Sequence, residues 1–220
     1  MFVVPIGALA WVLMWSSLLK VRDISVNAGS ESDAVRVMLA DQIGRNILLV
    51  HIAALTAAVT HAFPSLRDVS VVKRYPRGIT VSAVERTPIG IWCRGDACQL
   101  WDRDGIRWGE TIPSVGALLV EVNDQRSDDS VSPEFMSGLM AAIDGLAADG
   151  MEARIVTLPD AEPGGLRVTT TASFDVYMDA LGDVPDQLST LAVFLGDHAH
   201  DPSFKPAYID LRTPGRVYYK

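Results

Sequence analysis

The strongest structural signal in the sequence is FPSLRDVSVVKRYPRGITVSAVERTPIGIW, residues 63–92. Apolar and polar side chains alternate on both sides of the Tyr75-Pro76-Arg77-Gly78 segment, with the two-residue period of half-buried strands. Pro76 fixes φ at about −65° and Gly78 can adopt a positive φ, so these residues favour a turn. The stretch therefore predicts an antiparallel hairpin, which ends at Glu85-Arg86-Thr87-Pro88.

The residues before this hairpin complete a small α+β pattern. Residues 21–27 alternate like a short strand, and Ser32 is placed to cap a helix that runs to Ile43. A second helix is predicted from about His51 to Ala62, where Phe63-Pro64 ends it. The order strand, helix, helix, strand, strand predicts two helices packed on a small sheet.

The second half of the chain predicts a mixed β domain with flanking helices. Helices are expected from Pro133 to Gly150 and from Pro185 to Gly196, because apolar residues recur there at spacings of three and four. Alternating segments predict strands at 89–93, 98–102, 106–108, 152–158, 165–170 and 174–178, and a terminal pair at 207–211 and 216–219. We therefore expect three parts: an apolar segment at 1–19, a first domain at 20–87 and a second domain at 88–220.

Residues 1–19 contain no charged side chain and are long enough to cross a hydrocarbon core of about 30 Å as a helix. The alternative is a cleaved signal peptide, but neither a basic leading region nor a small-residue cleavage site precedes Lys20. We expect an uncleaved membrane anchor. The basic residues Lys20 and Arg22 follow the segment, which by the positive-inside rule would keep the remainder in the cytoplasm. A basic segment upstream of Met1, missing from this sequence, would reverse that orientation and place the remainder outside the cytoplasm.

Two cysteines indicate the opposite compartment. Cys93 and Cys98 flank a four-residue loop between two predicted strands, so they would lie opposite each other in a hairpin. A disulfide there would persist outside the cytoplasm and contribute roughly 2 kcal/mol. Half of a zinc site and a pair of free thiols remain as alternatives.

Charge and motif content give no reason to name a reaction. The formal net charge is −8, and the sequence has no run of basic residues that could bind the phosphates of a nucleic acid. Nucleic acid is therefore not an expected partner. The nucleotide-binding, hydrolase and metalloprotease motifs are absent from the sequence. His198 and His200 are two residues apart and share neither a helix face nor a strand face, so we expect a solvated loop there, and neither a metal nor a cofactor.

Several short motifs in one order resemble the bacterial cell division family FtsQ/DivIB, across nearly the whole chain. They include Gly44-Arg45-Asn46-Ile47-Leu48, Phe63-Pro64, Val84 to Pro88, Leu100-Trp101-Asp102 and Tyr208 to Arg212. The resemblance implies a membrane anchor, a POTRA domain with β-α-α-β-β order and a β domain whose C-terminal edge strand binds the FtsB/FtsL coiled-coil pair. It further implies a non-enzymatic scaffold for septal peptidoglycan synthesis, in the cell membrane with its domains outside the cytoplasm at the septum.

The chain departs from the family in two respects. The family normally has a basic cytoplasmic tail, which this sequence lacks, and it usually lacks the Cys93 and Cys98 pair. Neither departure affects the C-terminal end.

The resemblance directs attention to the C-terminus as the docking site. A partner segment would add to a sheet edge there, where tyrosines supply contact area and arginines pair with carboxylates. The alternative is that the tyrosines pack internally and the arginines are solvated. The predicted partner-binding residues are Arg212, Arg216, Val217, Tyr218, Tyr219 and Lys220.

The exposed basic cluster at Arg74, Tyr75 and Arg77 is a second expected docking surface, which would steer an acidic divisome component. The alternative is a structural role, in which Arg74, Glu85 and Arg86 form cross-strand pairs. Two other functions remain open for the chain. They are a POTRA-containing outer-membrane assembly or secretion protein, in which client strands add to the sheet edge, and an anchored envelope hydrolase or sugar-binding domain, which needs a polar pocket.

Overall fold

The computed structural model describes residues 17–114, 116–122, 132–159, 164–201 and 203–220. The chain divides between Arg86 and Thr87 into two compact units, each with its own hydrophobic core. Both units combine helices with β-sheet, so the fold is mixed α+β, as the sequence predicts.

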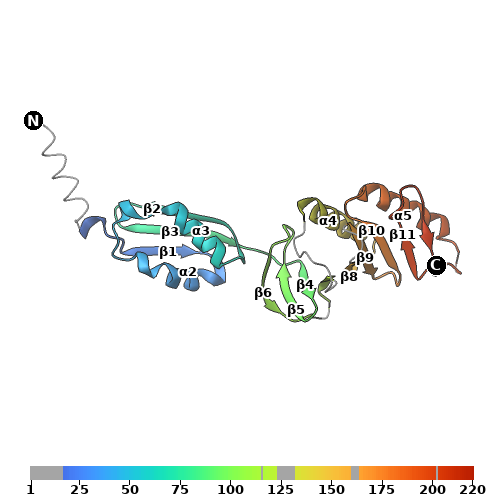
Figure 1. Cartoon of the computed structure of the whole chain (residues 1–220), viewed down its shortest axis with the longest axis horizontal. Helices are drawn as coiled ribbons and strands as arrows, with labels where there is room; N and C mark the ends of the chain where they lie inside the picture. The colour runs from blue at the N-terminus through green and yellow to red at the C-terminus, as the bar shows by residue number, and fades with distance from the viewer. Residues whose placement is uncertain (1–16, 115, 123–131, 160–163, 202) are drawn as a thin grey trace, which may run out of the picture. The chain divides into compact units, whose positions relative to one another are not determined.

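The first unit is a three-stranded sheet with two helices (Figure 1). Strand β1 runs parallel to β3, and β2 and β3 form the antiparallel hairpin. A bulge in β2 lies between Arg67 and Ser70, where Asp68 has φ 55°. The elements are η1 (Ser17–Leu19), β1 (Asp23–Asn27), η2 (Gly29–Glu31), α2 (Ser32–Met38), η3 (Leu39–Gln42), η4 (Ile47–Leu49), α3 (Ile52–Ala62), β2 (Leu66–Arg74) and β3 (Gly78–Glu85).

One face of this sheet is buried and the other is exposed, because strand side chains alternate. Val71, Ile79 and Val81 lie in the core, whereas Val72 and Val84 are exposed. The buried face meets the two helices, where Val35 of α2 and Val59 of α3 are fully buried.

Two local expectations for the first unit are corrected. Ser32 does not cap α2: it is the first helical residue, and its hydroxyl donates to the Gly29 carbonyl at 2.8 Å. The helix ends at Met38 and continues only as the 3₁₀ turn η3.

The cross-strand pair of Arg74 with Glu85 does not form, because these residues lie at opposite ends of the hairpin. Arg74 faces Gly78 and Glu85 faces Leu66. The Glu85 carboxylate instead accepts hydrogen bonds from the backbone and hydroxyl of Ser30, which lowers the pKa of Glu85.

The second unit contains a nine-stranded mixed sheet of order β12-β11-β10-β9-β8-β7-β4-β5-β6. The pairs β4·β7, β7·β8 and β10·β11 are parallel and the other neighbours are antiparallel. The elements are β4 (Gly90–Arg94), β5 (Ala97–Trp101), β6 (Arg107–Thr111), β7 (Leu118–Val122), α4 (Pro133–Ala148), β8 (Ala153–Leu158), β9 (Gly165–Thr170), β10 (Asp175–Asp179), α5 (Val184–His198), β11 (Tyr208–Asp210) and β12 (Tyr218–Tyr219).

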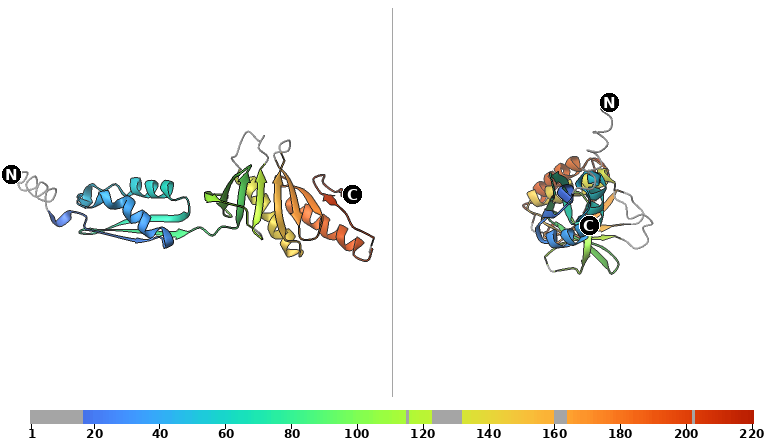
Figure 2. Two further views of the ribbon diagram at one scale, coloured as in Figure 1. Left: turned by 90° about the horizontal axis from the view of Figure 1, so that it is seen from below. Right: turned by 90° about the vertical axis from the view of Figure 1, so that its left-hand side faces the viewer.

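Helices α4 and α5 cover one face of this sheet (Figure 2). Both begin with a proline in the first turn and a side-chain cap: Ser132 accepts from the Phe135 N–H, and Asp183 accepts from the Asp186 N–H. Leu139 of α4 and Leu191 of α5 are fully buried in the core. The packing of α4 and α5 on this face holds in place the strands that precede the C-terminus.

Strand β7 was not predicted from the sequence, and the last strand is shorter than the predicted 216–219. Residues 118–122 form a short, mainly apolar run without clear alternation, which is typical of a strand between two parallel neighbours. Only Tyr218 and Tyr219 form β12, because the backbone N–H of Arg216 donates to the Thr213 carbonyl in the preceding turn.

The membrane segment expected at residues 1–19 lies outside the described residues except for η1. In the part of the chain that the structure describes, no helix is both long and apolar enough to cross a membrane.

Candidate partner-binding edge

The C-terminal strand β12 forms one edge of the nine-stranded sheet. Tyr219 lies opposite Ile209, and Tyr218 lies opposite Asp210 in the antiparallel ladder. Lys220 donates its backbone N–H to the Tyr208 carbonyl, so Tyr219, one residue earlier, directs its own N–H and C=O away from β11. None of the described strands pairs with that outer side. The edge therefore presents main-chain groups that an added strand can bind.

One face of this edge is fixed by aromatic packing against α5. The ring of Tyr219 lies 5.1 Å from Phe194, 6.0 Å from His198 and 5.7 Å from Phe204, measured between ring centroids. Val217 packs against the main core beside them. Tyr219 is nevertheless 52% exposed, so its ring both anchors the strand and remains accessible.

The opposite face of the same strands carries a polar network around Tyr177. Arg167 and Arg212 lie over the Tyr177 ring at 5.9 and 5.2 Å, and Tyr208 meets its edge at 5.6 Å. We call this the open face, and it comprises Arg167, Asp175, Tyr177, Tyr208, Asp210, Arg212 and Tyr218. Tyr218 belongs to it because cross-strand partners share a face, and Tyr218 faces Asp210.

Ion pairs fix the arginines of the open face. Arg167 donates to Asp175 at 2.6 and 2.9 Å, and this bond raises the pKa of Arg167. Arg212 donates to both carboxylate oxygens of Asp210, at 2.9 and 2.6 Å, and thereby lowers the pKa of Asp210. A partner carboxylate would therefore have to share Arg212 with Asp210.

The structure brings the six predicted C-terminal residues together at one edge, in different environments. Arg216 and Lys220 are exposed, Tyr218 is 48% exposed, Val217 is half-buried, and Arg212 is bonded to Asp210. The sequence did not single out Phe194, Phe204 and Tyr177, because their contacts join segments that are distant in sequence. The apolar spacing of α5 is the only signal that bears on any of them.

The solvated loop expected at His198 is corrected: His198 is the last residue of α5 and its ring packs in the aromatic cluster. Its Nδ1 lies 2.9 Å from the Phe194 carbonyl oxygen. A pocket of about 540 Å³ opens beside it, with a mainly apolar lining that includes Phe174, Leu195 and Phe204. Among the described residues, no group of three or more His, Cys, Asp or Glu side chains is arranged to hold a metal ion.

The second expected docking surface is the tip of the β2·β3 hairpin. Tyr75 is 63% exposed and precedes Pro76 through a cis peptide bond. Arg77 donates its Nε to the Leu18 carbonyl at 3.1 Å, whereas the Arg74 side chain is exposed.

Cys93 and Cys98 lie directly opposite each other on β4 and β5 and are joined by a disulfide. The hairpin turn between the strands is Gly95-Asp96, shorter than the expected four-residue loop. Both cysteines are buried, together with Ile91, in a small cluster. This hairpin lies near the β6 edge of the sheet, with five strands between β4 and β12.

No family model matches the chain. Two curated proteins are similar to it: cell division protein FtsQ of Streptomyces collinus is 28% identical over 125 residues, and cell division protein FtsQ of Mycobacteroides abscessus is 29% identical over 114 residues. The matched regions cover 55% and 50% of this chain, and 47% and 36% of the two relatives. The chain thus spans less than half the length of the relatives that it matches.

Proposed function

We propose, from the FtsQ/DivIB family assignment that the two relatives support, that this chain is a non-enzymatic scaffold of the bacterial division machinery. The similarity to FtsQ proteins implies a role in cell division. In the finer proposal, the protein is a single-pass membrane protein with its domains outside the cytoplasm at the septum. The first unit acts as a POTRA domain, and the second binds FtsB/FtsL-type coiled-coil partners to regulate septal peptidoglycan synthesis.

The observation that carries the partner proposal is the outward-facing backbone of Tyr219 at the edge of a nine-stranded sheet. An extended partner segment adds there as the next strand, and main-chain hydrogen bonds supply affinity. Tyr218 and the polar network beside it supply contacts on the open face, while the aromatic cluster keeps the edge in position on the other face.

A pair of variants at one position separates main-chain from side-chain docking. Tyr219→Ala removes the ring and retains the outward N–H, whereas Tyr219→Pro removes both. Proline is tolerated on an edge strand where its nitrogen faces solvent, so the hydrogen bonds to β11 persist in both variants. We expect Tyr219→Ala to weaken binding of the organism's FtsB/FtsL-type pair, and Tyr219→Pro to weaken it at least tenfold further, in a pull-down or calorimetric titration.

Circular dichroism should show the same fold for both variants. Equal affinities for the two variants would place binding on side chains rather than on the strand edge. Failure of the folded wild-type chain to bind the pair would remove the partner assignment.

A further inference from the structure

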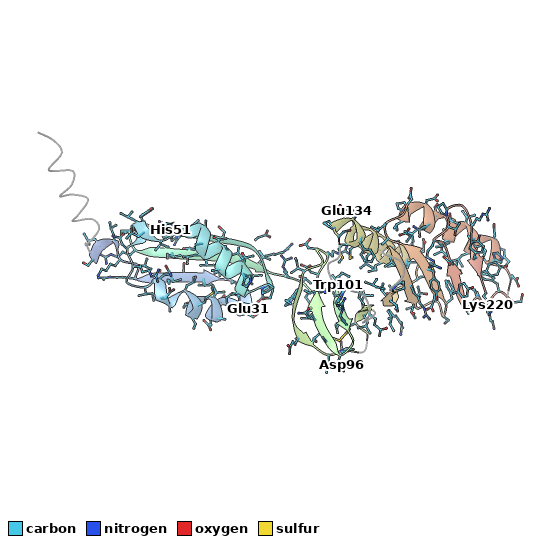
Figure 3. All side chains as sticks on the ribbon, in the orientation of Figure 1. Glu31, His51, Asp96, Trp101, Glu134 and Lys220 are labelled. Atoms are coloured by element: carbon cyan, nitrogen blue, oxygen red, sulfur yellow. A yellow bond between two sulfur atoms is a disulfide. The ribbon has the colours of Figure 1, made fainter. Side chains whose placement is uncertain are left out.

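An exposed apolar patch lies at the end of the first unit that contains η1 and η4. Figure 3 draws the side chains of this unit and labels His51, which follows η4 in the chain. Leu18 is 60%, Leu48 46%, Leu49 60% and Tyr75 63% exposed. They come from three segments that side-chain-to-backbone hydrogen bonds join. Arg77 bonds the Leu18 carbonyl at 3.1 Å, and Lys73 donates its Nζ to the Leu48 carbonyl at 3.2 Å.

The fold directs the side chains of Leu48 and Leu49 outward. Their neighbours Ile47 and Val50 are buried in the core, at 0% and 5% exposure. The turn between them is held by Asn46, whose side-chain oxygen accepts the Leu48 N–H at 2.9 Å. A capped turn therefore presents Leu48 and Leu49 side by side to the outside.

Basic residues surround these apolar side chains, which we name together the basal patch. Lys20 forms an isolated antiparallel β-bridge with Asn46, and the Arg45 carbonyl oxygen accepts the Val21 N–H. The acidic residues at this end are Asp23 and Asp41, and Asp41 is paired with Arg45 at 3.1 Å. The basal patch comprises Leu18, Ile43, Leu48, Leu49 and Tyr75 with Lys20, Arg22, Arg45, Lys73, Arg74 and Arg77.

The charge of this end is opposite to that of the chain as a whole. Six basic and two acidic residues give it a formal charge of +4 within a protein of net charge −8. The rest of the chain thus has 13 basic residues, 19 minus 6, and 25 acidic residues, 27 minus 2, or −12. Basic residues around exposed leucine and tyrosine side chains match the interface of an anionic bilayer, in which apolar groups enter the headgroup layer and cations meet lipid phosphates.

We propose that the basal patch binds the surface of an anionic lipid membrane and thereby seats the first unit on the bilayer. Lipid is favoured over an acidic protein because the sequence directly before the patch, residues 1–16, contains no charged residue. This inference rests on the membrane attachment in the proposed function, but it is independent of the partner at β12.

Hydroxyl-radical footprinting of the full chain in lipid nanodiscs tests this seating. We expect Leu48, Leu49 and Tyr75 to be oxidised at least threefold more slowly in discs of phosphatidylcholine with phosphatidylglycerol than in phosphatidylcholine alone. Val37 and Ile112, which are 75% and 80% exposed and lie outside the patch, serve as internal references whose rates stay unchanged. Added salt should reduce the protection, because the electrostatic part is screened.

A charge-reversal variant checks the role of the basic residues. Arg22→Glu with Arg45→Glu should abolish the protection in anionic discs, while the matched change Arg36→Glu, on exposed α2 outside the patch, leaves it intact. Equal oxidation of the wild-type patch in both lipids, with the chain still bound to the discs, overturns this inference alone. A chain that does not associate with either disc overturns membrane attachment as well.

Discussion

At the scale of single residues, Asp210 links the candidate edge to acid stability. Its carboxylate accepts two side-chain hydrogen bonds from Arg212, and this lowers the pKa of Asp210 in the folded protein. The pair contributes stability above the unfolded-state pKa of aspartate, about 3.9, and loses that contribution as the pH falls through the folded-state value. We expect Asp210→Asn to lower the free energy of unfolding at pH 7 by up to about 1 kcal/mol, since the pair is partly exposed to solvent.

Urea denaturation between pH 7 and pH 3 measures this effect. The variant should show a shallower loss of stability on acidification than the wild type. Asp33→Asn is the matched control, because Asp33 pairs with Arg36 while 91% exposed, and its replacement should change stability little. A wild-type acid profile in the Asp210→Asn variant would contradict the role of this pair.

Two helical glycines differ in the space around them. A Cβ on Gly138 of α4 would meet the Ala180 carbonyl oxygen at 1.9 Å, whereas a Cβ on Gly196 of α5 would meet nothing within 4 Å. We expect Gly138→Ala to destabilise the second unit by about 1–3 kcal/mol, through forced displacement of α4 from the end of β10. Gly196→Ala should instead stabilise it by up to about 1 kcal/mol, because alanine favours the helix. Thermal denaturation followed by circular dichroism distinguishes the two signs.

At the scale of elements, the sequence predicts those with local patterns and misses those that depend on distant neighbours. The β2·β3 hairpin and helices α4 and α5 are recognisable because alternation, proline and capping residues lie within each segment. Strand β7 is not, because it is defined by parallel pairing with β4 and β8. The C-terminal edge was expected from the family resemblance. The packing of Tyr219 on Phe194 and the hydrogen bond from Arg212 to Asp210 could be seen only in the three-dimensional structure.

The β4·β5 hairpin permits a prediction at this scale. Its disulfide closes a short loop, so the loop-entropy estimate is roughly 2 kcal/mol of stabilisation. We expect Cys93→Ala with Cys98→Ala to lower the free energy of unfolding of the second unit by about that amount. Because five strands separate β4 from β12, affinity for the proposed FtsB/FtsL-type partner should remain within twofold of wild type. Paired denaturation and binding measurements check both parts, and a large loss of affinity in a folded variant would reveal coupling across the sheet.

At the scale of the whole molecule, the two units have separate hydrophobic cores, so their stabilities can be altered one at a time. Leu39 is 2% exposed in the core of the first unit, and Leu191 is fully buried in the core of the second, beneath the strands that lead to β12. Truncating either leucine to alanine removes similar apolar volume and should cost about 2–5 kcal/mol within its own unit. We expect Leu191→Ala to weaken binding of the proposed partner, because it loosens the support of the edge strand, and Leu39→Ala to leave that binding unchanged.

Hydrogen exchange with mass spectrometry locates the effect of each truncation, and a titration with the FtsB/FtsL-type pair reports the binding. Exchange should accelerate only in residues 17–86 for Leu39→Ala and only in the second unit for Leu191→Ala. The opposite pairing, in which Leu39→Ala abolishes partner binding while the second unit keeps its wild-type protection, would place partner contacts on the first unit. In that case the exposed turn at Arg74, Tyr75 and Arg77 would be the surface to mutate next, because it is the other predicted docking site of the chain.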